Sequence, residues 1–346
     1  MISNLTISSW NVQGLGSKCS DETFNSYLKH DINILLETWK GSDSNLDIPE
    51  FSTFQRCRKK KRRPKRFSGG IIVLYQSKYK KGITEMPHIS SSENRLWFKL
   101  NKAFFGLNKD VYICACYIPP VSSNYYDDDF LNLENEISNI PKTSNILILG
   151  DLNARIGEKI DFIDNESLSL DSLQNVLPDD YSEDCTILRN TRDNIFNTQG
   201  QVFIDLCIAS QLRVLNGRFV GDILGNFTCH KSYGSSVVDY ALADMDLLTS
   251  INFFQVDSAT YLSDHSQISV HIYCNITPDF EEDSPNFIPL QCTYKWEAIS
   301  KNKLIDTISD CDVLHKIVSF ENNIFDENSN GIFQVGFIGK FIIAKH

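Results

Sequence analysis

The feature that most constrains the fold is a series of short apolar segments, each five to seven residues long, within the first 275 positions. Eight of them are continuously apolar or alternate with polar residues, and many of their side chains are β-branched, which predicts β-strands. These segments are Leu5–Ser9, Ile32–Leu36, Gly70–Tyr75, Leu96–Leu100, Val111–Cys116, Asn145–Leu149, Val237–Ala243 and Ile268–Cys274.

Two stretches between these strands have helical spacing. Their apolar residues are Phe130, Leu133, Ile137 and Ile140, closed by Pro141, and Val202, Leu206, Ala209 and Leu212, which follow Gly200. Strands mixed with helices predict an α/β sandwich, in which two packed, mixed β-sheets are flanked by helices. We expect residues 1–275 to form this domain. Residues 276–346 begin with an acidic, proline-bounded stretch typical of a linker and end in a tail too short for a domain.

The charge is unevenly distributed. The net charge of −11 argues against a polyanionic partner, because phosphate binding favours Lys and Arg. However, residues 56–66, here called the basic segment, carry nine basic side chains in eleven positions, which leaves 24 basic against 44 acidic residues elsewhere. The basic residues with a candidate binding role are Arg58, Lys59, Lys60, Lys61, Arg62, Arg63, Lys65 and Arg66.

The ten cysteines contain no CxxC pair, and Cys114 and Cys116 lie two apart in one strand, so they share a face and are expected to be buried free thiols. No apolar stretch approaches the roughly 18 residues that span a bilayer, and the N-terminus lacks a signal-peptide core. We therefore expect an intracellular protein without a membrane partner.

Polar residues that can bind metal or carry protons stand where the apolar strands stop. They are Asn11, Glu37, Tyr117, Asp151, Asp239 and the Asp264-His265 pair. Amide and carboxylate oxygens suit Mg²⁺ or Mn²⁺, which commonly keep few protein ligands and fill the remaining positions with water and phosphate. Some strands must be antiparallel, so the pattern leaves open whether these ends share one rim. Taken singly, Glu37 also fits a solvated strand edge, and Asn11 fits a turn.

Two segments are more specific. In Gly150–Arg155, the pattern D-x-N would place Asp151 and Asn153 on the same side of an extended chain, where the acid could activate water and the amide could donate to phosphate. An Asx turn or a helix cap is the alternative. In Ser263–Ser266, a carboxylate beside His265 could raise the imidazole pKa and make it an acid, a base or a cation against phosphate. A purely structural histidine is the alternative there.

These segments belong to a set of nine motifs that occur in order over residues 4–274. The motifs are SWNVQG (9–14), LETW (36–39), SGGI (68–71), YIPP (117–120), GDLNARIG (150–157), LNGR (215–218), FT (227–228), SVVDY (236–240) and SDH (263–265). In this respect the chain resembles the endonuclease/exonuclease/phosphatase superfamily and, more narrowly, the apurinic-type endonuclease domain of non-LTR (LINE-type) retrotransposons.

The resemblance implies a four-layer α/β sandwich, a bound Mg²⁺ (or Mn²⁺) without a small-molecule cofactor, and DNA as the partner that is nicked. It implies that Glu37 and Asn11 hold the metal, that Asp151 activates the attacking water and that Asn153 binds the scissile phosphate. His265 would stabilise the phosphorane, oriented by Asp264 or by Asp239, whichever is closer. Tyr117 would support the phosphate or the leaving group.

The same resemblance places a reverse transcriptase after such a domain, and Tyr294–Trp296 resembles the connector to it. Because no polymerase sequence follows, we expect a truncated copy or an incomplete gene model. Two alternatives stay open: a related phosphoesterase acting on RNA or on phosphorylated small molecules, and a catalytically silent DNA-binding remnant. The basic segment favours a long polyanion.

The basic segment provides the first test. If it lies along DNA phosphates, replacing Lys59–Arg63 with neutral residues should weaken DNA binding most at moderate salt. The slope of log affinity against log salt should become shallower by up to about 0.9 for each phosphate that the variant no longer neutralises. An unchanged affinity throughout a salt titration would leave a nuclear-localisation signal or a merely solvated loop as the explanation.

Overall fold

The computed structural model describes residues 3–41, 48–58, 67–163 and 187–277. The predicted linker and tail therefore lie outside the described residues from position 278 onward, as do Lys59–Arg66 and residues 164–186. The predictions made for those segments stay predictions.

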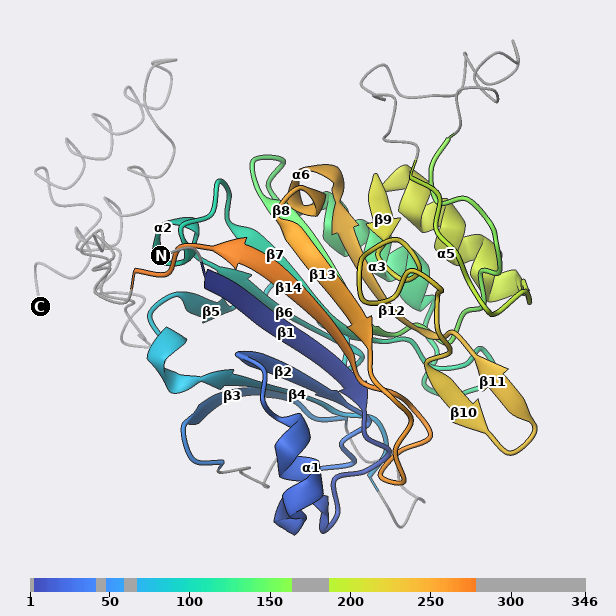
Figure 1. Cartoon of the computed structure of the whole chain (residues 1–346), viewed down its shortest axis with the longest axis horizontal. Helices are drawn as coiled ribbons and strands as arrows, with labels where there is room; N and C mark the ends of the chain where they lie inside the picture. The colour runs from blue at the N-terminus through green and yellow to red at the C-terminus, as the bar shows by residue number, and fades with distance from the viewer. Residues whose placement is uncertain (1–2, 42–47, 59–66, 164–186, 278–346) are drawn as a thin grey trace, which may run out of the picture. The chain divides into compact units, whose positions relative to one another are not determined.

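Two six-stranded mixed sheets form the body of the protein (Figure 1). The first has the order β13-β14-β1-β2-β4-β3, with β1 at Ser3–Asn11, β2 at Ile32–Leu36, β3 at Phe51–Arg56, β4 at Ile71–Gln76, β13 at Ile251–Val256 and β14 at Ile268–Cys274. The second has the order β5-β6-β7-β8-β12-β9, with β5 at Ile83–Glu85, β6 at Arg95–Leu100, β7 at Val111–Tyr117, β8 at Asn145–Asp151, β9 at Leu212–Val214 and β12 at Asp239–Asp244.

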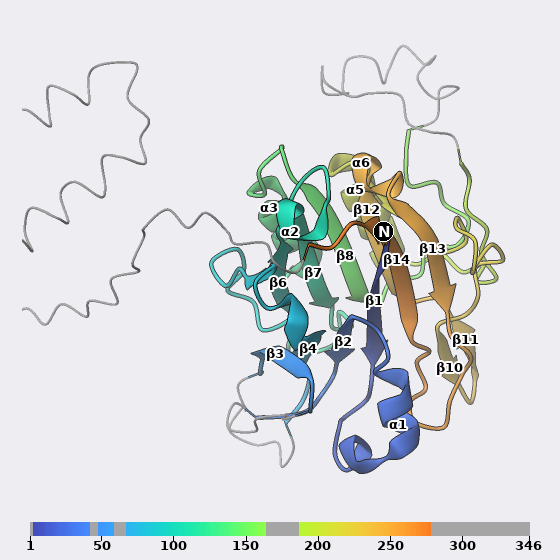
Figure 2. The same cartoon turned by 60° about the vertical axis from the view of Figure 1, so that its left-hand side comes forward.

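The other elements are short. The helices are α1 (Glu22–Tyr27), α2 (Lys102–Phe105), α3 (Asp129–Ser138), α5 (Thr198–Ala209) and α6 (Met245–Leu248), with 3₁₀ turns η1 (Lys18–Ser20) and η2 (Ser77–Tyr79). A separate hairpin pairs β10 (Cys229–Lys231) with β11 (Gly234–Ser236). Figure 2 shows this hairpin at the same end of the molecule as α1. No helix among the described residues has the length and apolar character needed to cross a membrane.

The two sheets pack face to face, as the strand pattern predicts. Their inner faces share one core, in which Ile7 and Ile34 of the first sheet join Ile113 and Leu149 of the second. Helices α3 and α5 cover the outer face of the second sheet, and α1 packs Phe24 against the outer face of the first. The predicted four-layer α/β sandwich is therefore confirmed. Cys114 and Cys116 are buried free thiols that face the same outer core from β7.

The strand directions place six strand ends at one rim. β1 and β2 run parallel, and so do β7 and β8, so the carboxyl ends of each pair lie together. β12 runs antiparallel to β8 and β14 runs antiparallel to β1, so these two strands begin where the others end. Register pairs Asp151 with both Tyr117 and Asp239. The question that the sequence left open is thereby answered: the polar strand ends share a rim.

Gly150 allows β7 and β8 to approach each other directly before Asp151. A Cβ atom at this position would lie 1.7 Å from the carbonyl oxygen of Cys116. Gly150→Ala should therefore lower the free energy of unfolding by about 1–3 kcal/mol or more, measured by urea denaturation. Gly16→Ala is the control: Gly16 has a positive φ but open space around its Cβ position, so only backbone strain of about 1–2 kcal/mol is expected. If Gly150→Ala were as stable as the wild type, the close approach would be wrong.

Candidate active site

Asn11 joins the two sheets at the rim. Its Nδ2 donates to Asp151 Oδ2 at 2.9 Å and to Glu37 Oε1 at 3.2 Å, and its Oδ1 accepts from the backbone N–H of Gln13. Asn11 and Asp151 are both 1% exposed. Glu37 has φ 51°, a left-handed conformation that is rare for a residue with a side chain and is concentrated at functional sites. One amide thus bridges two carboxylates that are 114 residues apart in the sequence.

The rim holds Asp151 in an unusual electrostatic environment. Burial first, and then the nearby charge of Asp239, raises the pKa of Asp151 to about 7. The imidazole of His265 and the hydrogen bond from Asn11 oppose this effect, whereas Glu37 adds to it. A carboxyl whose pKa lies near neutrality can accept a proton in the working pH range, which is the property of a general base.

Asp239, not the adjacent Asp264, orients His265. Asp239 Oδ2 lies 2.8 Å from His265 Nδ1, and both side chains are buried. Asp264 Oδ1 lies 3.6 Å from the other ring nitrogen, Nε2, beyond hydrogen-bond distance. Burial alone would lower the pKa of His265, but the Asp239 carboxylate raises it to about 12, so the ring is held as an imidazolium. Of the two orienting residues that the sequence left open, the structure selects Asp239.

The loop that carries His265 is fixed to the first strand. Ser263 Oγ donates to the carbonyl of Asn11 at 2.7 Å, and Trp10 Nε1 donates to the carbonyl of His265 at 2.8 Å. These bonds connect positions more than 250 residues apart. The imidazole is therefore positioned by backbone and side-chain contacts that do not depend on a ligand.

Two residues that sequence reasoning gave no role position Asp239. Thr228 Oγ1 accepts from the backbone N–H groups of Val238 and Asp239, both at 3.0 Å. Asn216 Nδ2 donates to the carbonyl of Asp239 and its Oδ1 accepts from the N–H of Ala241. Asn216 belongs to the LNGR motif and Thr228 to the FT motif. The motifs therefore marked both positions, but the chemistry of metal ligands alone did not show that they position Asp239.

Tyr117 lies against the carboxylates, whereas Arg58 is buried beside Tyr117. Burial first, and then the charges of Glu37 and Asp151, raise the pKa of Tyr117 far above its ordinary value. The Arg58 guanidinium stacks 5.5 Å from the Tyr117 ring centroid and 4.4 Å from that of Tyr125, and Nη2 donates to Asn94 Oδ1. The expectation that Arg58 contacts DNA from a surface loop is therefore wrong for the described structure, because its charge is used inside the protein.

Asn153 departs from the predicted extended chain. Its φ is 46°, its backbone N–H donates to Asp151 Oδ1 at 3.0 Å, and its Nδ2 donates to the carbonyl of Ile118 at 3.0 Å. This is the Asx turn that the sequence offered as the alternative. The turn nevertheless keeps the Asn153 amide beside the rim, and Nδ2 has a second hydrogen that is not used in the contact with Ile118.

The donor set suits a hard divalent cation. Glu37, Asp151 and Asp239 bring carboxylate oxygens to one rim, where Asn11 donates from Nδ2 to Glu37 and Asp151. Ligand atoms of Asp151, Asp239 and His265 lie within 4.8 Å of one another. The raised pKa of Asp151 reflects uncompensated negative charge and burial, which a cation would relieve. Mg²⁺ and Mn²⁺ prefer such carboxylate oxygens. The residues present therefore fit the metal that the resemblance implies.

No family model and no curated protein sequence matches the chain. Its fold matches solved structures. The endonuclease domain of TRAS1, a telomere-specific non-LTR retrotransposon, superposes with a TM-score of 0.50 and 14% identity over 78% of this chain and 98% of that one. The 3′ phosphatase NExo from Neisseria, bound to a product DNA hairpin, superposes with a TM-score of 0.51 and 13% identity. The match covers 78% of this chain and 99% of that one. The catalytic domain of Xenopus laevis APE2 superposes with a TM-score of 0.55 and 15% identity. The match covers 78% of this chain and 92% of that one.

These solved structures belong to the endonuclease/exonuclease/phosphatase superfamily, and the chain has the fold of that superfamily. The resemblance drawn from the nine motifs is confirmed at this level. Among the similar structures is the endonuclease domain of a non-LTR retrotransposon, the narrower class that the motifs indicate.

The Asp239–His265 pair makes a testable electrostatic prediction. In metal-free protein, His265 should stay protonated through pH 9, because the Asp239 carboxylate holds its pKa near 12. Asp239→Asn removes that charge, so the His265 pKa should fall towards its ordinary 6.5 and the ring should titrate below pH 8. NMR of the imidazole carbons during a pH titration measures the His265 pKa in the wild type and in the variant. Asp264→Asn is the matched control and should move the His265 pKa much less; the reverse ranking would mean that Asp264 is the orienting partner.

Proposed function

We propose that this protein is a divalent-metal-dependent phosphodiesterase that nicks DNA and leaves a 3′-hydroxyl. The observation that carries the proposal is the meeting of Asp151 and the Asp239–His265 pair at one buried rim, with Asn11 and Glu37 beside them. Phosphodiester hydrolysis needs a base for water, positive charge for the phosphorane and stabilisation of the leaving oxygen, and these residues can supply each of them.

In the proposed reaction, Asp151 accepts a proton from the attacking water, for which a pKa near neutrality suits it. The His265 imidazolium stabilises the charge that develops on the phosphorane oxygens, and the Asn153 amide donates a hydrogen bond to the same phosphate. Tyr117 donates its hydroxyl proton in a hydrogen bond to the phosphate or to the departing 3′-oxygen. Glu37 and Asn11 would hold Mg²⁺, which when bound supplies Lewis-acid stabilisation of phosphate and leaving-group charge.

DNA is the proposed substrate for two reasons. The solved structures with this fold include the endonuclease domain of a retrotransposon and a 3′ phosphatase bound to a product DNA hairpin, so proteins with this fold act on DNA. The basic segment contains Arg58, which packs on Tyr117 of the rim, and a run of positive charge in the sequence favours a long polyanion over a single phosphate ester.

The direct test uses supercoiled plasmid with Mg²⁺. The wild type should convert it to nicked circles, and Asp151→Ala should reduce the rate by about 10³-fold or more, since it loses both the base and a rim carboxylate. Asp205→Ala is the control, because Asp205 is an exposed aspartate on α5 whose described side-chain contact is with Gln201, and its rate should stay unchanged.

Parallel reactions with poly(A) and with soluble phosphate esters separate DNA cutting from the related activities. Faster turnover of either substrate than of plasmid would reassign the substrate while keeping the site. Equal inertness of wild type and Asp151→Ala on all three, under varied salt and metal, would end the catalytic proposal and favour the DNA-binding remnant.

A further inference from the structure

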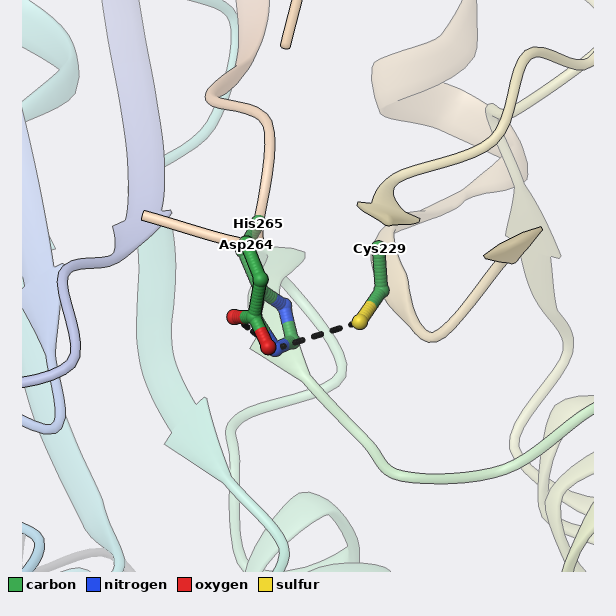
Figure 3. A group of neighbouring side chains, drawn as sticks. All are labelled: Cys229, Asp264 and His265. Atoms are coloured by element: carbon green, nitrogen blue, oxygen red, sulfur yellow. Dashed lines mark hydrogen bonds and ion pairs between the residues drawn. The ribbon is translucent and has the colours of Figure 1, made fainter. Parts of the chain in front are cut away.

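A second group of metal-competent side chains lies on the far side of the His265 ring. Cys229 Sγ is 3.6 Å from His265 Nε2, and Asp264 Oδ1 is 3.6 Å from the same nitrogen. Ligand atoms of the three residues all lie within 4.8 Å of one another. Figure 3 shows the three side chains turned towards one another, Cys229 from β10 and the other two from the loop before β14. None of the nine motifs assigns a role to Cys229.

The backbone holds this group together. Cys229 and His265 form an isolated antiparallel bridge between the β10–β11 hairpin and the loop before β14. The N–H of His230 donates to the carbonyl of Asp264 and the N–H of Ser266 donates to the carbonyl of Thr228, both at 2.7 Å. The thiol and the imidazole are therefore placed opposite each other by paired strands, and both residues are buried.

The spacing matches tetrahedral zinc. Zn–S bonds of about 2.3 Å and Zn–N bonds of about 2.0–2.1 Å place sulfur and nitrogen about 3.6 Å apart at the tetrahedral angle. Asp264 Oδ1 is buried and has no hydrogen-bond partner among the described residues, although it faces the group. Asp239 already occupies His265 Nδ1, which leaves Nε2 as the ligand atom and forms the carboxylate–histidine pair that commonly supports zinc.

We propose that Cys229, Asp264 and His265 form a zinc-type binding site in which a bound Zn²⁺ occupies His265 Nε2 and inhibits the enzyme. The inhibitory part rests on the proposed function, because it requires that Nε2 faces the phosphate during cutting; the binding part does not. On binding, Zn²⁺ displaces protons from Sγ and Nε2 into the solvent, and water completes the coordination.

The same ligands select against the ion expected at the catalytic rim. A thiolate and an imidazole favour Zn²⁺ or Co²⁺ over Mg²⁺, which binds oxygen donors. Lys18 and Lys231 lie near Asp264: burial lowers the pKa of Lys18 and the Asp264 charge only opposes that effect, whereas the pKa of Lys231 is raised because Cys229, Tyr233 and Asp264 together outweigh its burial. A cation at this group therefore binds close to two lysine side chains. Zn–S and Zn–N bonds offset this repulsion, whereas Mg²⁺ has a single carboxylate as a preferred ligand there.

The binding test uses Co²⁺ as a coloured probe on the full chain. Co²⁺ added to reduced, metal-free wild type should produce a thiolate-to-cobalt charge-transfer band and tetrahedral visible bands, and Zn²⁺ should remove both. Cys229→Ala should lose the charge-transfer band and bind Co²⁺ at least tenfold more weakly, whereas Cys19→Ala, at a half-buried cysteine outside the group, should retain both. Circular dichroism checks that each variant is folded. An unchanged charge-transfer band in folded Cys229→Ala would overturn the site.

The activity test separates inhibition at this site from replacement of Mg²⁺ at the rim. At fixed Mg²⁺, Zn²⁺ should stop plasmid nicking by the wild type, whereas Cys229→Ala, measured against its own zinc-free rate, should require at least tenfold more Zn²⁺ for the same fractional inhibition. Equal inhibition of both proteins would place the effect at the rim and overturn the inhibitory proposal. If no nicking occurs under any condition, the proposed function fails while the Co²⁺ titration still decides the metal site.

Discussion

The hydrogen bond from Asn11 to Asp151 is the contact on which the site depends. It joins the carboxyl end of β1 in one sheet to the carboxyl end of β8 in the other, and it is buried on both sides. The neutral amide of Asn11 donates hydrogen bonds to both carboxylates. Because it carries no charge, it leaves their negative charge unneutralised, so that the carboxylates can still bind a cation. The packing of the two sheets brings these strand ends together. The same packing that forms the hydrophobic core therefore also positions the residues of the site.

The strands that the sequence predicts and the strands that it misses differ in their place in the sheets. All eight predicted strands are interior strands of the two large sheets, where most side chains are buried and apolar residues are dense. Among the six strands that it misses in the described residues, β3, β5, β9 and β13 are the edge strands of the two large sheets, and β10 and β11 form the separate hairpin. β3 and β13 are mostly half-buried and β5 and β9 have only three residues, so neither periodicity nor length distinguishes them from loops.

The sequence predicted which residues form the candidate site, but it did not predict which of them contact one another. Strand-end position and ligand chemistry identified Asn11, Glu37, Asp151 and His265, because these depend on local sequence. The partner of the imidazole did not follow, since Asp264 is adjacent in sequence yet lies beside Nε2, whereas Asp239, 26 residues away, contacts Nδ1. Only the pairing of β12 with β8 and of β14 with β1 determines that choice.

The bonds from Trp10 and Ser263 that fix the His265 loop to the first strand have a consequence for how the protein gains and loses its site. They join positions about 250 residues apart, so forming the site requires closing a loop that takes in nearly the whole described domain. No half of the chain contains a working subset of the rim. Partial unfolding of either sheet therefore abolishes the site as a whole, and a fragment released by proteolysis carries ligands without the arrangement that makes them reactive.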